Sequence, residues 1–200
     1  MILTHANDIV DSNINNGFWV ITGANIGIGF SLASLLKNDG KKLLLIDKNI
    51  ENLNHLVSKD VVVKKFNLSE INQINELSEL IKTYPVYCLV NNAGVGYKGS
   101  LEEISIDKIN NTIRTNIIYP VILTKLLTAH LKEFSTIIVN VASSVAFNPL
   151  PNMSLYSASK AFLLNWSESL SYELRDTKCN YFFTIWHFFK LSRKCWCENI

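Results

Sequence analysis

Short runs of apolar residues alternate along this chain with longer segments of helical spacing. The runs are apolar almost throughout, which is typical of strands buried on both faces of a sheet. We predict strands at residues 18–22, 42–46, 61–66, 86–90, 136–142 and 180–185.

The segments between these runs place apolar residues on one helical face. The two clearest sets are Ile28, Leu32, Leu35 and Leu36 after Gly27, and Ile71, Ile74, Leu77 and Ile81 within residues 69–82. Longer helices are predicted over about residues 107–133 and from before Tyr156 to about residue 175. Strands joined through helices pair in parallel by right-handed crossovers, so we predict an α/β fold with an open, doubly wound parallel sheet.

The composition fits one domain with a buried core. The chain has 200 residues, of which 48% are hydrophobic and 18% charged. A formal net charge of +2 is too weak to indicate a nucleic acid or an acidic membrane surface as a partner. The first 17 residues do not resemble a secretory signal, and no run approaches the roughly 18 apolar residues of a membrane span. We expect a cytoplasmic protein without a membrane partner.

The cysteines give little support for a metal site. Cys88 lies in an apolar run and is predicted to be a buried small hydrophobe. Cys195 and Cys197 form a C-x-C pair near His187, but no second pair stands at ligand spacing, so we expect no metal.

Ligands of a doubly wound sheet bind beyond the carboxyl ends of its strands. After the first predicted strand stands TGANIGIG, residues 22–29, with glycines at 23, 27 and 29. Glycine lets the backbone approach a phosphate closely, and a helix N-terminus offers free N–H groups. This turn predicts a dinucleotide phosphate site; simple packing glycines are the alternative.

The second strand ends at Asp47, 24 residues beyond Gly23. An acid at about that distance accepts hydrogen bonds from an adenosine ribose and repels a 2′-phosphate, which favours NAD. Lys48 leaves NADP open, whereas Asn25 stands where a basic residue would favour NADP. A helix cap is the alternative interpretation of Asp47.

Polar residues follow the later strands too. Asn67 suits an adenine edge, NNAG follows at residues 91–94, and Ser143 and Ser144 follow the fifth strand. Each fits ordinary turn chemistry when taken singly. Their common position at strand ends favours one ligand site.

The stretch YSASK places Tyr156 and Lys160 on one helix face, with small residues between them. A neighbouring ammonium lowers the pKa of a phenol from its ordinary value of about 10. The pair therefore predicts a tyrosine acid/base, and a solvated helix face is the alternative.

Together TGANIGIG, NNAG, VNVASS and YSASK match, in order, the motifs of the short-chain dehydrogenase/reductase family, which residues 18–178 resemble. The resemblance implies a single Rossmann-type domain and an NAD(P)-dependent oxidoreductase that interconverts an alcohol and a ketone or other carbonyl. It implies Tyr156 as the acid/base, Lys160 as its partner, Ser143 rather than Ser144 as the carbonyl-binding serine, and Asn116 as part of a proton relay. The implied cofactor-binding residues are Thr22, Gly23, Asn25, Ile26, Gly27, Gly29, Asp47, Asn67, Asn91, Ala93, Gly94, Tyr156 and Lys160.

Pro120 stands four residues after Asn116 within a helical pattern. Proline has no N–H to bond the carbonyl at i−4. We predict a local kink that frees the Asn116 carbonyl to hold a water on a proton path from Lys160.

The two ends of the chain depart from the family pattern. Residues 1–17 form an N-terminal extension, and residues 179–200 form an atypical tail without the family's Pro-Gly turn or its last strand. The tail is rich in aromatic residues, namely Phe182, Phe183, Trp186, Phe188 and Phe189. A replacement wall for the substrate site and an out-of-frame tail both fit it.

The alternatives to an enzyme are a catalytically silent nucleotide-binding protein and a truncated, inactive gene product. The two long helices resemble the family's dimer-forming pair, which implies a homo-oligomer.

Overall fold

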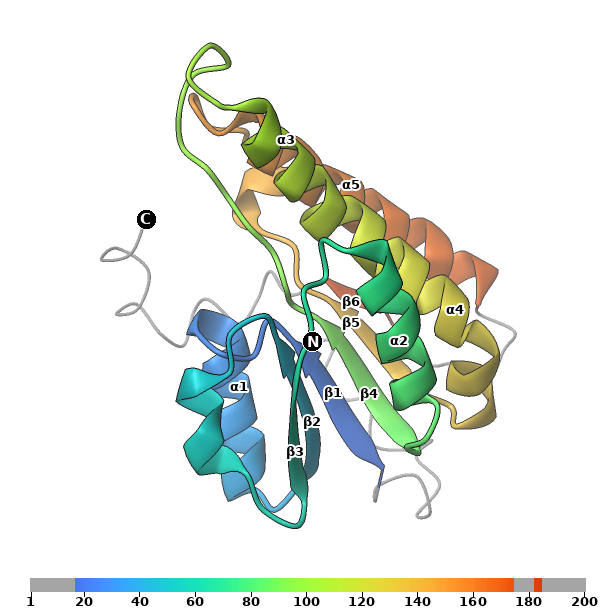
Figure 1. The fold of residues 1–200 in the computed structure, drawn as a ribbon. Coiled ribbons are helices and arrows are strands. Elements are labelled where there is room, and N and C mark those ends of the chain that lie inside the picture. Colours follow the sequence, from blue (N-terminus) through green and yellow to red (C-terminus); the bar gives the residue numbers. More distant parts are fainter. Residues whose placement is uncertain (1–16, 175–181, 185–200) are drawn as a thin grey trace.

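Six parallel strands form one sheet in the order β3-β2-β1-β4-β5-β6 (Figure 1). The computed structural model describes residues 17–174 and 182–184 of the chain. The strands are β1 (Phe18–Thr22), β2 (Lys42–Asp47), β3 (Val61–Lys65), β4 (Val86–Asn91), β5 (Ile137–Asn140) and β6 (Phe182–Thr184). All six predicted strands are present, and β3, β5 and β6 are shorter than predicted. The strand order reverses between β1 and β4, which is where such sheets bind ligands.

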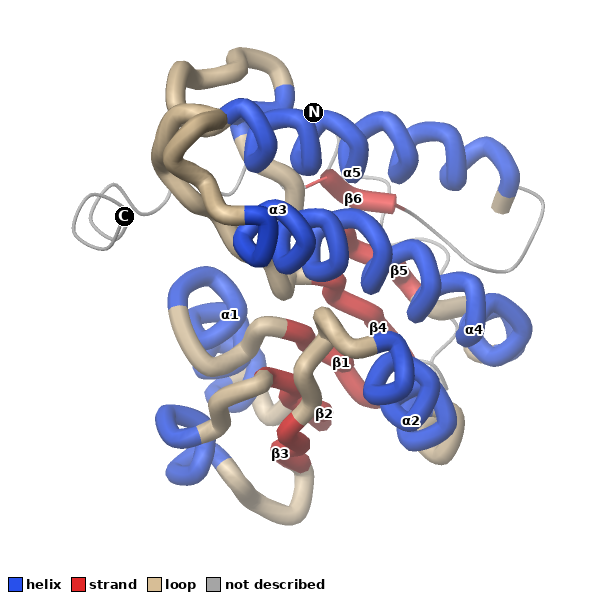
Figure 2. The backbone as a smooth tube through the Cα atoms, turned by 45° about the horizontal axis from the view of Figure 1, so that its top comes forward, coloured by secondary structure: helices blue, strands red, loops and turns tan. Residues whose placement is uncertain are grey.

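Helices cover both faces of the sheet, so the predicted doubly wound α/β fold is confirmed (Figure 2). One face carries α1 (Gly27–Asn38) and the 3-10 helix η2 (Glu51–Leu56). The other carries α2 (Ile71–Ile81), α3 (Ile106–Ile113), the π turn η3 (Arg114–Ile118), α4 (Tyr119–Glu133) and α5 (Ser154–Glu173). A short 3-10 helix, η4 (Ser144–Ala146), follows β5.

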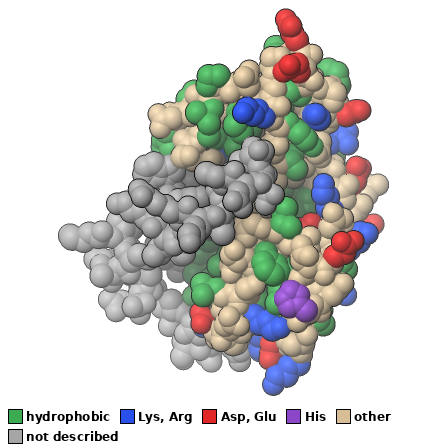
Figure 3. Space-filling view, turned by 90° about the vertical axis from the view of Figure 1, so that its left-hand side faces the viewer, with side chains coloured by type: hydrophobic (Ala, Val, Ile, Leu, Met, Phe, Trp, Pro, Cys, Tyr) green, Lys and Arg blue, Asp and Glu red, His purple; other side chains and the backbone are tan. Residues whose placement is uncertain are grey.

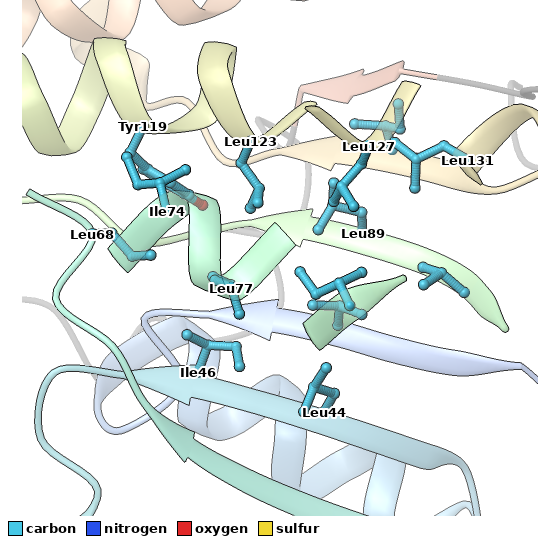
Figure 4. Packing of buried hydrophobic residues seen from close by; sticks show 14 of the residues in the cluster. Leu44, Ile46, Leu68, Ile74, Leu77, Leu89, Tyr119, Leu123, Leu127 and Leu131 are labelled. Atoms are coloured by element: carbon cyan, nitrogen blue, oxygen red, sulfur yellow. The ribbon is translucent and has the colours of Figure 1, made fainter. Parts of the chain in front are cut away.

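Alternate residues of the strands feed two separate hydrophobic cores. In β2, Leu44 and Ile46 point to the α2 and α4 side, and Leu43 and Leu45 point to the α1 side. Figure 4 shows the first core, in which Tyr119 lies at one end. Both faces of the central strands are therefore dry, which explains why the strand sequences are apolar throughout.

Two details of the helix prediction were wrong. The residues that face the sheet in α1 are Gly29, Ala33 and Leu36, while Leu35 is 54% exposed. Ile28, Leu32 and Leu36 pack on this side as predicted, and the small residues Gly29 and Ala33 lie among them because α1 packs close to the sheet. Ile71, predicted on the buried stripe, is 52% exposed because it is the first residue of α2.

The long helix predicted over 107–133 is continuous but changes geometry at the π turn. The short helix η2 carries no periodic signal of its own and was not predicted. Among the described residues, no helix is both long and apolar enough to cross a membrane. On the face shown in Figure 3, acidic and basic side chains are interspersed rather than separated into patches.

The C-x-C pair with its nearby histidine and most of the aromatic cluster lie outside the described residues. Phe182 and Phe183 form part of β6. The predicted N-terminal extension likewise falls outside, except for Gly17.

Candidate active site

The glycine turn between β1 and α1 is backbone packed against backbone. Gly23 and Gly27 have φ values of +63° and +60°, which favour glycine. A Cβ on Gly29 would lie 2.2 Å from the Gly23 carbonyl oxygen, so the first turn of α1 touches the end of β1. The local geometry thus favours glycine at all three positions whether or not a ligand binds.

The start of α1 leaves room beside its free N–H groups. Its N-cap residue, Ile26, makes no capping hydrogen bond through its side chain and is 69% exposed. A Cβ on Gly27 would meet no atom within 4 Å. The first N–H groups of a helix are unsatisfied and carry partial positive charge, so this open turn fits an anionic phosphate.

Thr22 and Asn92 join the glycine turn to the segment after β4. The Asn92 Nδ2 group donates to the carbonyl oxygens of Thr22 and Gly23, both at 2.9 Å. The Thr22 hydroxyl accepts from the Asn92 and Ala93 N–H groups at 3.0 and 3.2 Å. A Cβ on Gly23 would lie 2.7 Å from Ala93 Cα. Sequence reasoning missed Asn92; its only signal was its place within NNAG.

Asp47 lies beside the glycine turn, and its predicted role at the ribose stays a prediction. Its carboxylate accepts from the Asn25 N–H at 3.0 Å and from the Asn49 N–H at 3.1 Å. It therefore also orders the loop after β2, but it is not a helix cap, since the N-cap residues of α1 and η2 are Ile26 and Ile50. The Asn25 side chain is buried, and its oxygen accepts from the Asn52 N–H at 3.0 Å. Lys48 is exposed at the end of β2.

Two predicted binding residues have side chains engaged within the protein. The Asn67 side-chain oxygen accepts from the N–H and hydroxyl of Ser69, which shapes the turn before α2. Asn91 is 2% exposed, and its side chain contacts Asn140 at 2.9 Å and Tyr119 at 3.0 Å. The buried Asn91 side chain thus anchors the 91–94 segment to the core.

Helix α5 places Tyr156 and Lys160 at the same edge of the sheet. Lys160 is 4% exposed, and its Nζ donates to the Val141 carbonyl oxygen at 2.7 Å. The same Nζ lies 5.8 Å from the centre of the Tyr156 ring. A Cβ on Gly94 would lie 3.3 Å from the Lys160 Nζ. The NNAG segment therefore runs directly past the lysine.

Burial moves both groups toward their neutral forms. Burial raises the pKa of Tyr156, and an interaction with the Ser143 side chain lowers it by less. Burial lowers the pKa of Lys160 from 10.5 to about 8. The predicted lowering of the tyrosine pKa by Lys160 is therefore not a property of the protein alone. The reason is that burial of the phenol raises its pKa by more than the Ser143 hydrogen bond lowers it, while the Lys160 ammonium donates to the Val141 carbonyl.

Asn116 is central to the arrangement. It lies in the π turn, is 1% exposed, and its side chain bonds both the N–H and the carbonyl of Val95 at 2.8 Å. Its Nδ2 also donates to the Ser159 hydroxyl at 2.9 Å. The helix departs from α geometry at Asn116, just ahead of Pro120. π turns commonly bend helices. The proton path through a water at the Asn116 carbonyl stays a prediction.

Of the two serines after β5, Ser143 is the better placed. Ser143 is half-buried and interacts with Tyr156, whereas Ser144 is exposed. The Ser143 hydroxyl also accepts from the Val145 N–H, which starts η4. Across the site, a Cβ on Gly96 would lie 3.0 Å from Tyr156 Cδ2. Sequence reasoning missed Gly96, although it stands two residues after NNAG.

In the parts of the chain that the structure describes, no three histidine, cysteine, aspartate or glutamate side chains gather as metal ligands would. The site instead combines an anion-binding turn, an acid beside it, and a buried lysine with a partly buried phenol. These groups come from the ends of β1 and β2 and from α5, and the segments after β4 and β5 lie beside the lysine and the phenol. Such an arrangement suits a dinucleotide and a proton transfer.

Comparisons with known proteins agree with this geometry. A family model described as short chain dehydrogenase matches residues 18–182. The uncharacterized oxidoreductase DltE of Bacillus subtilis (strain 168) is 34% identical over 173 residues, covering 82% of this chain and 68% of DltE.

Solved structures share the fold. The bulky-bulky ketone specific alcohol dehydrogenase from Comamonas testosteroni is 27% identical with a TM-score of 0.75, covering 80% of this chain and 68% of that one. A 4-hydroxyisoleucine dehydrogenase complexed with NADH is 24% identical with a TM-score of 0.76, covering 82% and 70%, and its likeness concerns the fold. The chain spans 52% to 68% of the lengths of DltE and three further curated relatives.

Proposed function

The chain belongs to the short-chain dehydrogenase family, and from this premise we propose that it is an NAD(P)-dependent oxidoreductase that interconverts an alcohol and a carbonyl. The observation that carries the proposal is the meeting of Tyr156, Lys160, Ser143 and Asn116 beside the glycine turn. These side chains come from three separate segments, namely α5, η3 and the turn after β5, and share one edge of the sheet.

The coenzyme site is assigned to the edge between β1 and β4. The turn from Thr22 to Gly29 binds the pyrophosphate through backbone N–H groups, because its glycines leave the backbone open. Asp47 accepts hydrogen bonds from the adenosine ribose, which favours NAD; Lys48 is the residue that would accept NADP. Asn67 and the 91–94 segment complete the predicted set. A bound nicotinamide coenzyme supplies or accepts the hydride.

The chain's own residues manage the proton and the developing charge. Tyr156 gives its proton to the carbonyl oxygen during reduction and takes it back during oxidation. Ser143 donates a hydrogen bond to the same oxygen. Lys160 is mostly charged at pH 7 because its pKa is about 8. Lowering a phenol pKa by about three units requires roughly 4 kcal/mol of preference for phenolate. Since burial acts in the opposite sense, the positive charges of Lys160 and of the oxidised coenzyme must supply it.

The test combines binding and turnover. NADH and NADPH are titrated by fluorescence, and ketones and secondary alcohols are screened with the wild type and with Tyr156→Phe. We expect coenzyme binding within twofold of the wild type and a loss of kcat of at least about 100-fold. Tyr172→Phe changes an exposed tyrosine on the same helix and is the matched control. Full turnover by Tyr156→Phe would contradict the assigned role.

A catalytically silent nucleotide-binding protein is the second candidate. The observation in its favour is that burial shifts both Tyr156 and Lys160 toward neutral forms. Binding of NADH without turnover of any substrate by the wild type would support it. If the wild type shows no coenzyme binding and no turnover, the chain is an inactive gene product.

We further propose that the protein is a cytoplasmic homo-oligomer that pairs through α4 and α5, as the resemblance implies. Phe162 on α5 is 39% exposed, so this helix offers apolar surface to a second copy. Light scattering of the wild type and of Phe162→Lys tests the pairing. A monomeric wild type would refute it.

A further inference from the structure

Tyr119 is a fully buried tyrosine in a place that the proposed mechanism does not use. It is the first residue of α4, directly after the π turn, and its side chain is 0% exposed (Figure 4). Its hydroxyl lies 2.5 Å from the Thr22 hydroxyl and 3.0 Å from the Asn91 side-chain oxygen. Thr22 and Tyr119 are 97 positions apart in the sequence, so only the fold brings them together.

Counting protons gives these contacts a direction. The Asn91 amide donates through Nδ2 to Asn140 Oδ1, so its oxygen faces Tyr119 as an acceptor. The phenol proton therefore goes to Asn91. A hydroxyl has one proton and two lone pairs. Thr22 uses its lone pairs for the Asn92 and Ala93 N–H groups, so its single proton is shared between the Val90 carbonyl oxygen and the Tyr119 oxygen. Tyr119 therefore accepts part of the Thr22 proton and donates its own proton to Asn91.

One helix thus holds both ends of the segment from Asn91 to Val95. Tyr119 holds the first residue, and Asn116 holds Val95 through two hydrogen bonds of 2.8 Å. Thr22 holds the middle of the segment through two backbone N–H groups. The π turn contains Asn116 and ends at Ile118, directly before Tyr119, so the change in helix geometry lies at the two holding points.

The Thr22 hydroxyl also connects this brace to the glycine turn. Gly23 follows Thr22 directly, and its backbone packs so closely against Ala93 that a Cβ on Gly23 would lie 2.7 Å from Ala93 Cα. A change in the Thr22 side-chain rotamer would therefore shift the turn relative to the segment. Tyr119 opposes that change because its oxygen occupies the fourth contact of the Thr22 hydroxyl.

We propose that Tyr119 is a positioning residue for coenzyme binding, which acts through Thr22 to set the glycine turn against the 91–95 segment. The inference rests on the proposed function. It predicts that loss of the phenol oxygen weakens coenzyme affinity and leaves the chemical step intact, because Tyr156, Lys160 and Ser143 stay in place.

Tyr119→Phe removes the oxygen and keeps the ring. We expect the Kd for NADH, or for NADPH if that coenzyme binds more tightly, to rise at least fivefold, with kcat at saturating coenzyme within twofold. Tyr87→Phe is the control: Tyr87 packs against Trp19 at the amino end of the sheet, and its variant should change neither quantity by more than twofold. Urea unfolding of every variant is followed in parallel.

A second variant tests the route. Thr22→Val is nearly isosteric and removes the hydroxyl, so it should raise Kd by itself. Adding Tyr119→Phe to it should change Kd by less than twofold, because the path is already broken. A Kd for Tyr119→Phe within twofold of the wild type, together with a lower unfolding midpoint, would show a merely structural role and overturn the proposal. So would effects that multiply in the double variant, or a Thr22→Val variant with wild-type Kd. A wild type that binds neither NADH nor NADPH overturns the proposed function instead, before any variant is compared.

Discussion

Lys160→Met should make the stability of this protein less dependent on pH. Lys160 is buried, and its pKa is lowered from 10.5 to about 8 by the loss of solvent. In the unfolded chain the ammonium keeps its ordinary pKa. Between about pH 8 and 10.5 the unfolded chain therefore binds more protons than the folded protein, so the free energy of unfolding rises with pH.

The magnitude follows from the two pKa values. At about 1.4 kcal/mol per pH unit, the difference between 10.5 and about 8 corresponds to roughly 3.4 kcal/mol. This cost is almost fully present at pH 7, where both states are protonated. At pH 9.5 the folded protein has released the proton and about 2 kcal/mol of the cost has disappeared. Methionine has no such titration, and the hydrogen bond to Val141 that it loses changes stability by an amount that does not vary with pH.

Urea unfolding at pH 7.0 and pH 9.5, without coenzyme, measures the effect. We expect the difference in unfolding free energy between the wild type and Lys160→Met to change by about 2 kcal/mol between the two pH values, in favour of the wild type at the higher one. Lys48→Met removes an exposed lysine and is the control, with a change below about 0.5 kcal/mol. Equal differences at both pH values for Lys160→Met would refute the reasoning that burial sets this pKa.

Three other substitutions test the packing around the site. Gly96→Ala places a Cβ 3.0 Å from the Tyr156 ring. In steady-state assays kcat should therefore fall at least tenfold, while the Kd for the coenzyme stays within twofold. An unchanged kcat would show that the ring has room to shift. Gly29→Ala brings a Cβ to 2.2 Å from the Gly23 carbonyl oxygen. We expect a loss of about 1–3 kcal/mol in the free energy of unfolding in urea, and loss of NADH binding. Retained binding would contradict the close packing of the turn. Ser105→Ala removes the N-cap of α3, which should cost about 0.5–1 kcal/mol in the same unfolding assay and leave coenzyme affinity unchanged.

Local patterns were enough to locate most elements of the fold. Strand runs such as residues 42–46 are apolar on both faces, and this requires helices on both sides of a parallel sheet. The spacing of Tyr156 and Lys160 determined that both lie on one face of α5. The order of the glycine turn, NNAG and YSASK along the chain indicated where each stands relative to a strand end. All of these are properties of residues close together in sequence.

The sequence by itself thus determined the elements, their order and the types of residue at the strand ends. The tertiary structure decided which side chains meet: Tyr119 with Thr22, Asn116 with Val95, and the Gly96 backbone with the Tyr156 ring. It also decided that the pKa of Tyr156 is raised, because desolvation depends on everything packed around the phenol. Hydrogen bonds between residues far apart in the chain leave no periodic signal, so they became visible only once the sheet and its helices were assembled.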